Sequence, residues 1–320
     1  MKEPDPSLTN LKDDEINLKE IFNIIFQGKK LIAFFTVFAF CLSLIYSLTL
    51  QNIYKSTAIL NPIEKTDSIS GALENFSGIA SLAGINLPAS TQESNTAKAI
   101  EKLKSLSFFE NEIMPNIKLE ELMAVKYWDE QKNILVFDSN IYNVESNLWV
   151  RDFSFPQKQI PSAQESFLQF HDKNLFVNLD NQTGFVTLEI EHQSPFIAKQ
   201  WADLIVKQIN SFYREKDKAE AEKAINFLNS QLEKTRLSEV RLALVNILEL
   251  EIQKLTLVEA NELYVFDYID PAAVMEEKFG PNRVLIIILG MLFSLIASII
   301  FVLFRHFQKK DISSETNLNY

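Results

Sequence analysis

The sequence contains few groups of residues that could catalyse a reaction. Paired carboxylates can act as a general acid and a general base. Adjacent acidic residues on a protein surface are usually only solvated, so we assign no catalytic role to the three pairs in this chain. These pairs are Asp13 with Asp14, Glu120 with Glu121, and Glu276 with Glu277. We therefore predict that the chain is not an enzyme and has no catalytic residue.

Neither a metal nor a phosphate site is predicted. The three histidines, His171, His192 and His306, lie far apart, and no HExxH, CxxC or other metal-ligand spacing occurs. Gly28 precedes two lysines but lacks the upstream glycine of a phosphate-binding loop. The single cysteine, Cys41, excludes an intramolecular disulfide. We expect no cofactor and no metal.

Two uncharged apolar segments, residues 31–50 and 284–304, dominate the organisation of the chain. A helix rises about 1.5 Å per residue, so each segment can cross the ~30 Å hydrocarbon core of a bilayer. Buried core helices rarely run this long without a charge. A cleaved signal peptide fits the first segment poorly, because thirty residues precede it and bulky residues follow it. We predict two transmembrane helices, the first an uncleaved anchor.

Small residues recur every fourth position in both predicted spans. Such a spacing places them on one face of a helix and allows another backbone to approach closely. We predict that these stripes pack the spans together or against a partner. The residues are Ala39, Ser43 and Ser47 in the first span, and Gly290, Ser294 and Ser298 in the second.

The two spans divide the chain into five predicted segments. These are a cytoplasmic tail (1–30), a transmembrane helix (31–50), a periplasmic domain (51–283), a second transmembrane helix (284–304) and a cytoplasmic tail (305–320). Positive charges next to the spans set orientation. Lys29, Lys30, Arg305, Lys309 and Lys310 favour cytoplasmic tails, against Lys55, Lys278 and Arg283 on the other side.

The net charge of −11 lies entirely on segment 51–283, because the two tails hold 8 basic and 8 acidic residues. An acidic domain is repelled by phosphate backbones and by anionic lipid surfaces. Nucleic acid is therefore excluded as a partner.

Segment 51–283 combines strand and helix patterns, which predicts an α+β class. Residues 53–60 read as a strand stopped by Asn61 and Pro62, and 264–269 read as a strand returning to the membrane. Residues 175–179 and 185–191 alternate around a turn, which predicts a β-hairpin. Segment 68–97 is rich in small residues and is either a loop or a packing surface.

A helical region covers about 195–263, where residues 196–270 contain neither glycine nor proline. An unbroken helix of this length would span on the order of 100 Å, so we expect it to project or to fold back near 234–239. A narrow apolar seam on projecting helices needs partners, which favours self-association or a helical hairpin. We predict long helices rising from a mixed α/β base close to the membrane. A shorter helical pattern covers 97–112.

The order of these segments resembles the Wzz-type polysaccharide co-polymerases, the O-antigen chain length determinants, over nearly the whole chain. The resemblance lies in EINLKEIFNIIFQGKKLI, YKSTAILNP, SGIASLAGI and AKAIEKLKSLSFFE. It continues in TGFVTLEIEHQSPFIAKQWADLIVKQIN, AINFLNSQLEKTRLSEVR and the exit FDYIDPAAV…GPNRVLIIILG. It implies a ring-like homo-oligomer in the inner membrane that modulates a separate polymerase and has no recognised catalytic site.

One departure from the family concerns the exit segment before the second span. The family is often rich in proline there, whereas this chain has Met275 and Lys278 at expected proline positions and retains Pro281. With Pro271, Pro281 bounds the predicted membrane-exit linker.

The sequence therefore predicts a non-enzymatic, homo-oligomeric inner-membrane scaffold that regulates the chain length of lipopolysaccharide O-antigen. Expected partners are the O-antigen polymerase, the growing lipid-linked polysaccharide and membrane lipid. A co-polymerase for capsule or exopolysaccharide is the main alternative. Such proteins can carry a cytoplasmic kinase domain, for which we expect no room in 305–320. A periplasmic tethering protein or a sensor fits less well.

Overall fold

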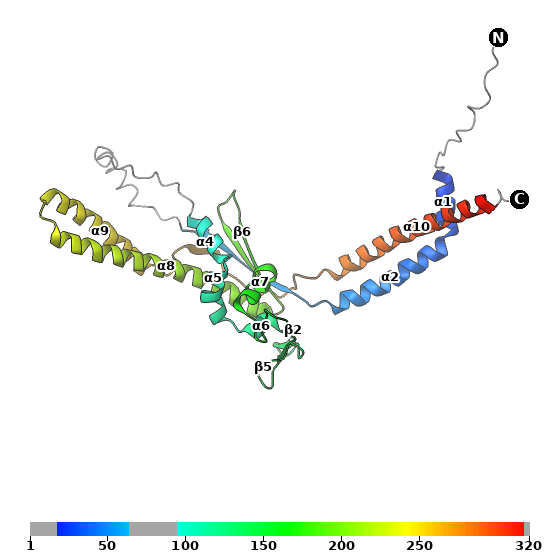
Figure 1. Cartoon of the computed structure of the whole chain (residues 1–320), viewed down its shortest axis with the longest axis horizontal. Coiled ribbons are helices and arrows are strands. Elements are labelled where there is room, and N and C mark those ends of the chain that lie inside the picture. The colour runs from blue at the N-terminus through cyan, green and yellow to red at the C-terminus, as the bar shows by residue number, and fades with distance from the viewer. Residues whose placement is uncertain (1–17, 64–94, 317–320) are drawn as a thin grey trace, which may run out of the picture. The chain divides into compact units, whose positions relative to one another are not determined.

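A computed structural model of the chain describes residues 18–63 and 95–316. The chain divides into two compact units (Figure 1). One unit comprises Met1–Leu50 with Pro281–Tyr320, and the other comprises Gln51–Gly280. The predicted segment 68–97 lies outside the described residues up to residue 94.

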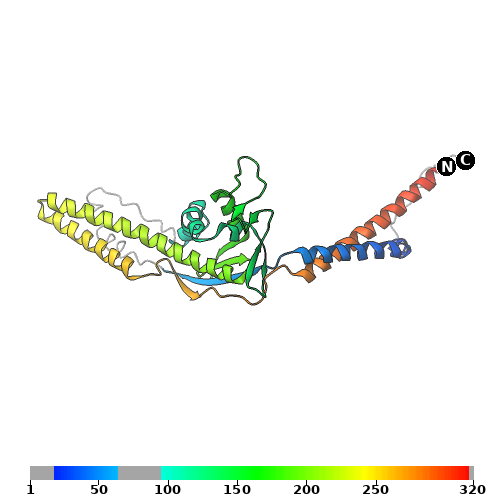
Figure 2. The same ribbon diagram turned by 90° about the horizontal axis from the view of Figure 1, so that it is seen from below.

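The described part of the first unit is mainly helical. It contains α1 (Leu18–Gln27), α2 (Lys29–Thr49) and α10 (Arg283–Thr316). By length and composition, Lys29–Thr49 and Arg283–His306 could each cross a membrane. The two helices lie side by side (Figures 1 and 2). Helix α10 continues to Thr316, so part of the predicted C-terminal tail is helical.

The second unit is built on a four-stranded antiparallel sheet. Its order is β6 (Leu175–Leu179), β7 (Val186–His192), β1 (Tyr54–Pro62) and β8 (Phe266–Asp270). Buried and partly exposed residues alternate along β7, as expected for a strand with one face on a core. The predicted hairpin of β6 and β7 is confirmed.

Helix α8 (Pro195–Lys234) covers the buried face of this sheet with its first four turns. Trp201, Ile205 and Ile209 are almost fully buried there. Removing each such side chain from water stabilises the fold by about 2–3 kcal/mol. This packing joins the hairpin and the strands into one core.

The remainder of α8 extends beyond the sheet and is accompanied by α9 (Ser238–Ala260), as Figures 1 and 2 show. Residues 235–237 separate the two helices. The predicted reversal near 234–239 is confirmed. The mixture of sheet and long helices confirms the predicted α+β class.

Short helices complete the core on the side of α8. The predicted helix at 97–112 is interrupted, because Ser105 caps a new helix by accepting a hydrogen bond from the Phe108 N–H. The elements are α4 (Asn95–Leu103), α5 (Leu106–Phe108), η2 (Phe109–Ile113), η3 (Met114–Asn116), α6 (Leu119–Met123) and α7 (Ala163–Lys173).

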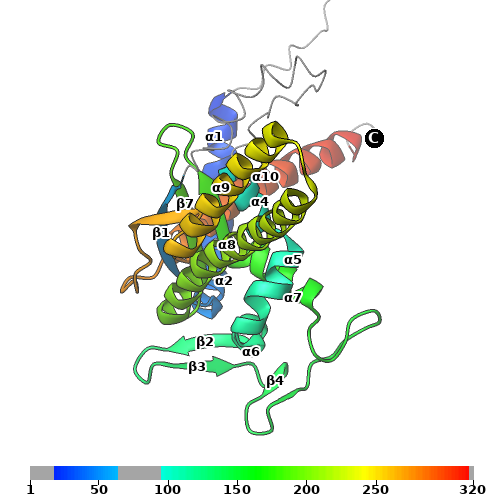
Figure 3. The same cartoon turned by 90° about the vertical axis from the view of Figure 1, so that its left-hand side faces the viewer.

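Two small ribbons lie between α6 and α7 in the sequence. One pairs β2 (Val125–Asp129) with β3 (Ile134–Phe137), and the other pairs β4 (Tyr142–Asn143) with β5 (Leu148–Trp149). Figure 3 shows the first ribbon beside α6, with β4 close to it. Bidentate hydrogen bonds between Arg151 and Glu165 tie the following loop to α7.

The predicted stop at Asn61 and Pro62 is wrong. Strand β1 runs through both residues, which pair with Asp267 and Phe266 of β8. The strand ends at Pro62, two residues beyond the predicted end, because the proline carbonyl group can still accept a hydrogen bond although its nitrogen cannot donate one.

Candidate functional site

The small residues of the two apolar helices face each other. A Cβ atom built on Gly290 would lie 2.8 Å from Ser43 Cβ and 3.1 Å from Ser43 Oγ. Real Cβ atoms do not approach so closely, so only glycine allows the present separation of α2 and α10. The absence of a side chain at Gly290 thus permits a close approach of α10 to Ser43 of α2.

The other predicted stripe residues lie on the same faces. Ser294 Oγ donates a 2.9 Å hydrogen bond to the Phe35 carbonyl of α2. Ser47 and Ser298 are buried, although they lie in helices whose other side chains are mostly exposed. Ala39 is partly exposed. Gly290 with Ser43, and Ser294 with Phe35, therefore lie between α2 and α10, whereas the packing role of the complete stripes stays a prediction.

A further close approach involves Gly28, between α1 and α2, which sequence reasoning did not select for packing. A Cβ atom on Gly28 would lie 2.5 Å from Val302 Cγ1 of α10. The sequence feature that could have indicated this contact is a glycine just before an apolar span.

The exit segment after β8 is held by hydrogen bonds and one cation–π contact. Ile53 and Gly280 form a bridge in which the Ile53 N–H donates to the Gly280 carbonyl at 2.9 Å. Ser56 Oγ donates to the Ala273 carbonyl at 2.7 Å, and Lys55 Nζ lies 4.2 Å from the centre of the Phe279 ring.

The two predicted linker prolines occupy the ends of this segment. Pro271 follows β8 directly, and Pro281 precedes α10.

Asn210 of α8 fixes the chain where it leaves the helical hairpin. Its Oδ1 accepts hydrogen bonds of 2.7–3.0 Å from the N–H groups of Tyr264, Val265 and Phe266. Its Nδ2 donates to the carbonyls of Val206 and Phe266. Asn210 is 2% exposed. One amide side chain thus provides hydrogen-bond partners for the backbone N–H and carbonyl groups at the start of β8.

The helical hairpin has a small buried seam and large exposed apolar residues. Ala221, Leu228 and Val258 are buried, and Lys218 Nζ lies 3.0 Å from Glu259 Oε1. By contrast, at least half of the side-chain surface of several large residues remains accessible. These residues are Phe227, Leu237, Leu242 and Leu257. Exposed apolar surface of this kind is typical of a contact with another molecule.

The histidines do not form a site. His192 is buried, its Nε2 lies 2.9 Å from the Glu121 carbonyl and its Nδ1 accepts from the Ser194 N–H. Burial lowers the pKa of His192 to about 4, so the ring is neutral at pH 7. His171 contacts Asp172 on the surface. Within residues 18–63 and 95–316, no cluster of acidic, histidine or cysteine side chains could hold a metal ion.

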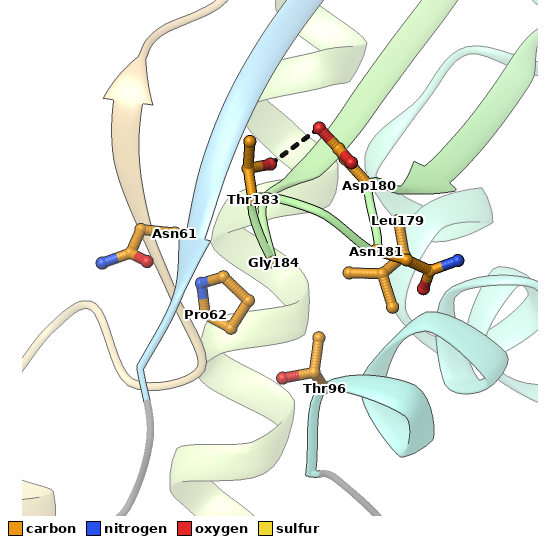
Figure 4. Close-up of a pocket in the computed structure, with 8 residues that line it drawn as sticks. All are labelled: Asn61, Pro62, Thr96, Leu179, Asp180, Asn181, Thr183 and Gly184. Atoms are coloured by element: carbon orange, nitrogen blue, oxygen red, sulfur yellow. Dashed lines mark hydrogen bonds between the residues drawn. The ribbon is translucent and has the colours of Figure 1, made fainter.

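A polar hollow of about 340 Å³ lies between the end of β1, the start of α4 and the β6–β7 turn (Figure 4). Thr183 Oγ1 donates to Asp180 Oδ2 at 2.8 Å. The Gln182 and Thr183 donors lower the pKa of Asp180. Because the Asp180 carboxylate already accepts hydrogen bonds within the β6–β7 turn, the groups that the hollow presents to a ligand are mainly amides and hydroxyls.

In the comparison with known proteins, one family model matches the N-terminal third of the chain. Residues 14–113 match the family model described as Wzz, chain length determinant protein. This match confirms the predicted resemblance to the Wzz family. The Wzz segment (14–113) contains α1, α2, β1 and the helices up to η2. No curated protein sequence matches the chain.

Solved structures of two polysaccharide co-polymerases align with the chain. A full-length bacterial polysaccharide co-polymerase is 11% identical, with 92% of this chain and 99% of that chain aligned and a TM-score of 0.40. A fragment of WzzB, a polysaccharide co-polymerase from Salmonella Typhimurium, is 12% identical. Its alignment covers 72% of this chain and 100% of that chain, with a TM-score of 0.31.

Proposed function

We propose that this chain is a non-enzymatic regulator of lipopolysaccharide O-antigen chain length. It acts as a homo-oligomeric scaffold in the bacterial inner membrane and modulates the O-antigen polymerase, which extends the lipid-linked polysaccharide. The match of residues 14–113 to the chain length determinant family is the observation that carries this proposal.

The two apolar helices support the proposed membrane location. Both are long enough to span a bilayer, and Gly290 and Ser294 of α10 lie against Ser43 and Phe35 of α2. In this proposal the termini are cytoplasmic, and the acidic unit Gln51–Gly280 is periplasmic. The lipid-facing surface of the helix pair is then available to the polymerase.

The helical hairpin supports self-association. Its exposed apolar residues would be buried between neighbouring copies, which favours association at about 25 cal/mol per Å² of apolar surface before the entropy of association is subtracted. Phe227→Asp tests this directly, because Phe227 is 62% exposed and its replacement leaves the core intact. Chemical cross-linking in membranes is expected to capture oligomers of the parent chain and fewer oligomers of this variant.

A matched control is Lys223→Asp, a charge change at an exposed position of the same helix. Equal oligomer yields for the parent and Phe227→Asp would remove the hairpin from the proposed interface. The function itself is tested by comparing lipopolysaccharide length with and without the gene. A change in capsule or exopolysaccharide length instead would assign the chain to that polymer.

A further inference from the structure

An aromatic hollow of about 400 Å³ opens on the surface of the unit Gln51–Gly280. Its lining residues come from the β2–β3 ribbon, the β4–β5 ribbon, α6 with the residue before it, and the first turn of α8. Its lining combines aromatic rings with amide and carboxylate groups. Among the described residues, the lining comes from residues 118–147 and 194–197.

Trp128 forms a fixed aromatic wall. Its ring packs edge-on against Tyr54, with centres 5.4 Å apart, and against Phe196, with centres 6.0 Å apart. Phe196 remains 46% exposed although it lies beside Trp128. The faces of pyranose rings carry C–H groups, and their weak positive charge complements the negative face of an aromatic ring.

Two asparagines hold their amide groups at the edge of this wall. Asn133 and Asn147 have φ values of 50° and 53°, which asparagine adopts more readily than most residues. Asn133 Oδ1 accepts from Trp128 Nε1 at 3.0 Å, and Asn147 Oδ1 accepts from the Tyr142 hydroxyl at 3.2 Å. Each carbonyl oxygen is therefore oriented, and each NH₂ group keeps donors for a ligand.

The charged residues favour a neutral ligand rich in hydroxyl groups. Glu120 is partly exposed in the lining, and among the described residues its carboxylate has no hydrogen-bond or ion-pair partner. Lys118 is the one cation among the described residues of the lining, and its Nζ lies 3.3 Å from Glu121 Oε1. An anion would be repelled by the excess acidic charge, whereas a hydroxyl group can donate to Glu120.

We propose that this aromatic hollow binds a neutral sugar residue of a polysaccharide chain. The sugar packs against Trp128 and Phe196, donates a hydroxyl hydrogen bond to Glu120, and accepts from the amides of Asn133 and Asn147. This inference rests on the proposed function for its source of saccharide. It adds a direct contact between the scaffold and the polymer whose length it sets.

Saturation-transfer NMR on the full chain in detergent tests the proposal. The probe is delipidated polysaccharide released by mild acid from the source bacterium, and maltoheptaose serves as an unrelated neutral glucan. Glu120→Gln and Trp128→Ala are each expected to weaken binding roughly tenfold or more, since one charged hydrogen bond or aromatic contact contributes about that factor. Glu120→Gln leaves the aromatic packing unchanged, which keeps the test valid if Trp128→Ala misfolds.

Tyr127→Ala is the matched control, because Tyr127 is 47% exposed on the adjacent position of β2 and does not line the hollow. It should bind as the parent does. No saturable binding by the parent, or equal binding by folded Glu120→Gln, would overturn the proposal. Loss of oligomers in both hollow variants without saccharide binding would also overturn it and assign the hollow to a contact between copies.

The two proposals fail separately. If deletion of the gene alters polysaccharide length but the protein binds no saccharide, this inference is wrong and the proposed function stands. If the protein binds saccharide through Trp128 but deletion leaves all surface polymers unchanged, the proposed function is wrong and the binding site stands.

Discussion

The contact between Gly290 and Ser43 gives a prediction about the membrane helix pair. Gly290→Leu places a Cβ atom 2.8 Å from Ser43 Cβ and adds a branched side chain beyond it. Because both contacting groups are attached rigidly to their helices, α2 and α10 must move apart. We expect the variant to retain both helices and to lose their close packing.

The expected loss in stability of the helix pair in Gly290→Leu is the sum of two contributions. Overpacking of a close contact costs about 1–3 kcal/mol. Separation also breaks the hydrogen bond from Ser294 to the Phe35 carbonyl, and interhelical bonds in membranes contribute about 0.6 kcal/mol on average. The helix pair should therefore be destabilised by about 2–4 kcal/mol, which lowers its association constant by a factor of roughly 30 to 1,000.

Thiol bridging across the pair measures this separation. The rings of Phe35 and Phe301 lie 6.1 Å apart, on the two helices. Cysteine at both positions, in a Cys41→Ser background, can be bridged by dibromobimane, which becomes fluorescent when it joins two nearby thiols. Fluorescence from membranes should fall markedly when Gly290→Leu is added.

Ala297→Leu is the matched control, because Ala297 is an exposed small residue of the same helix. Its bridging should equal that of the parent. Undiminished bridging in Gly290→Leu would show that the helices do not pack through this glycine, and would refute the reasoning from the small-residue stripes.

Three further predictions concern stability. Asn210→Ala leaves buried N–H groups without an acceptor and should lower the free energy of unfolding by about 3 kcal/mol. Thermal unfolding measures this loss of stability. An equal loss for the exposed-site variant Lys207→Ala would contradict the prediction. The pKa of His192 is about 4 in the fold against 6.5 unfolded. The unfolded state then binds more protons between these pH values, so the free energy of unfolding should fall by up to about 3 kcal/mol as the pH falls from 6.5 to 4. Denaturant titrations of His192→Gln should show a smaller decrease in stability at acidic pH. An identical decrease would exclude this histidine as the cause. Gly28→Ala should lower thermal stability in detergent by crowding Val302, and Val302→Ala should restore it; absence of rescue would place the defect elsewhere.

Periodic features of the sequence predicted the larger elements. Strand β7 alternates over seven residues, and α8 lacks glycine and contains proline only at its first position. The spacing of Ser43 and Ser294 also indicated which helix faces carry small residues. These signals are local, because each repeats within one element.

The remaining features depend on contacts between distant segments. Strands β4 and β5 have two residues each, too few to show a period of two. The ring of Trp128 is packed by Tyr54 and Phe196, which lie far from it in sequence. A single buried amide such as Asn210 resembles any polar residue of an exposed helix until the returning chain is placed.

The distribution of lipopolysaccharide lengths in the source bacterium, with and without this gene, tests the central claim most directly. We predict a clustered ladder on a silver-stained gel that becomes a smooth, mostly short distribution on deletion and is restored by the gene. An unchanged ladder would contradict the assignment as a regulator of O-antigen length.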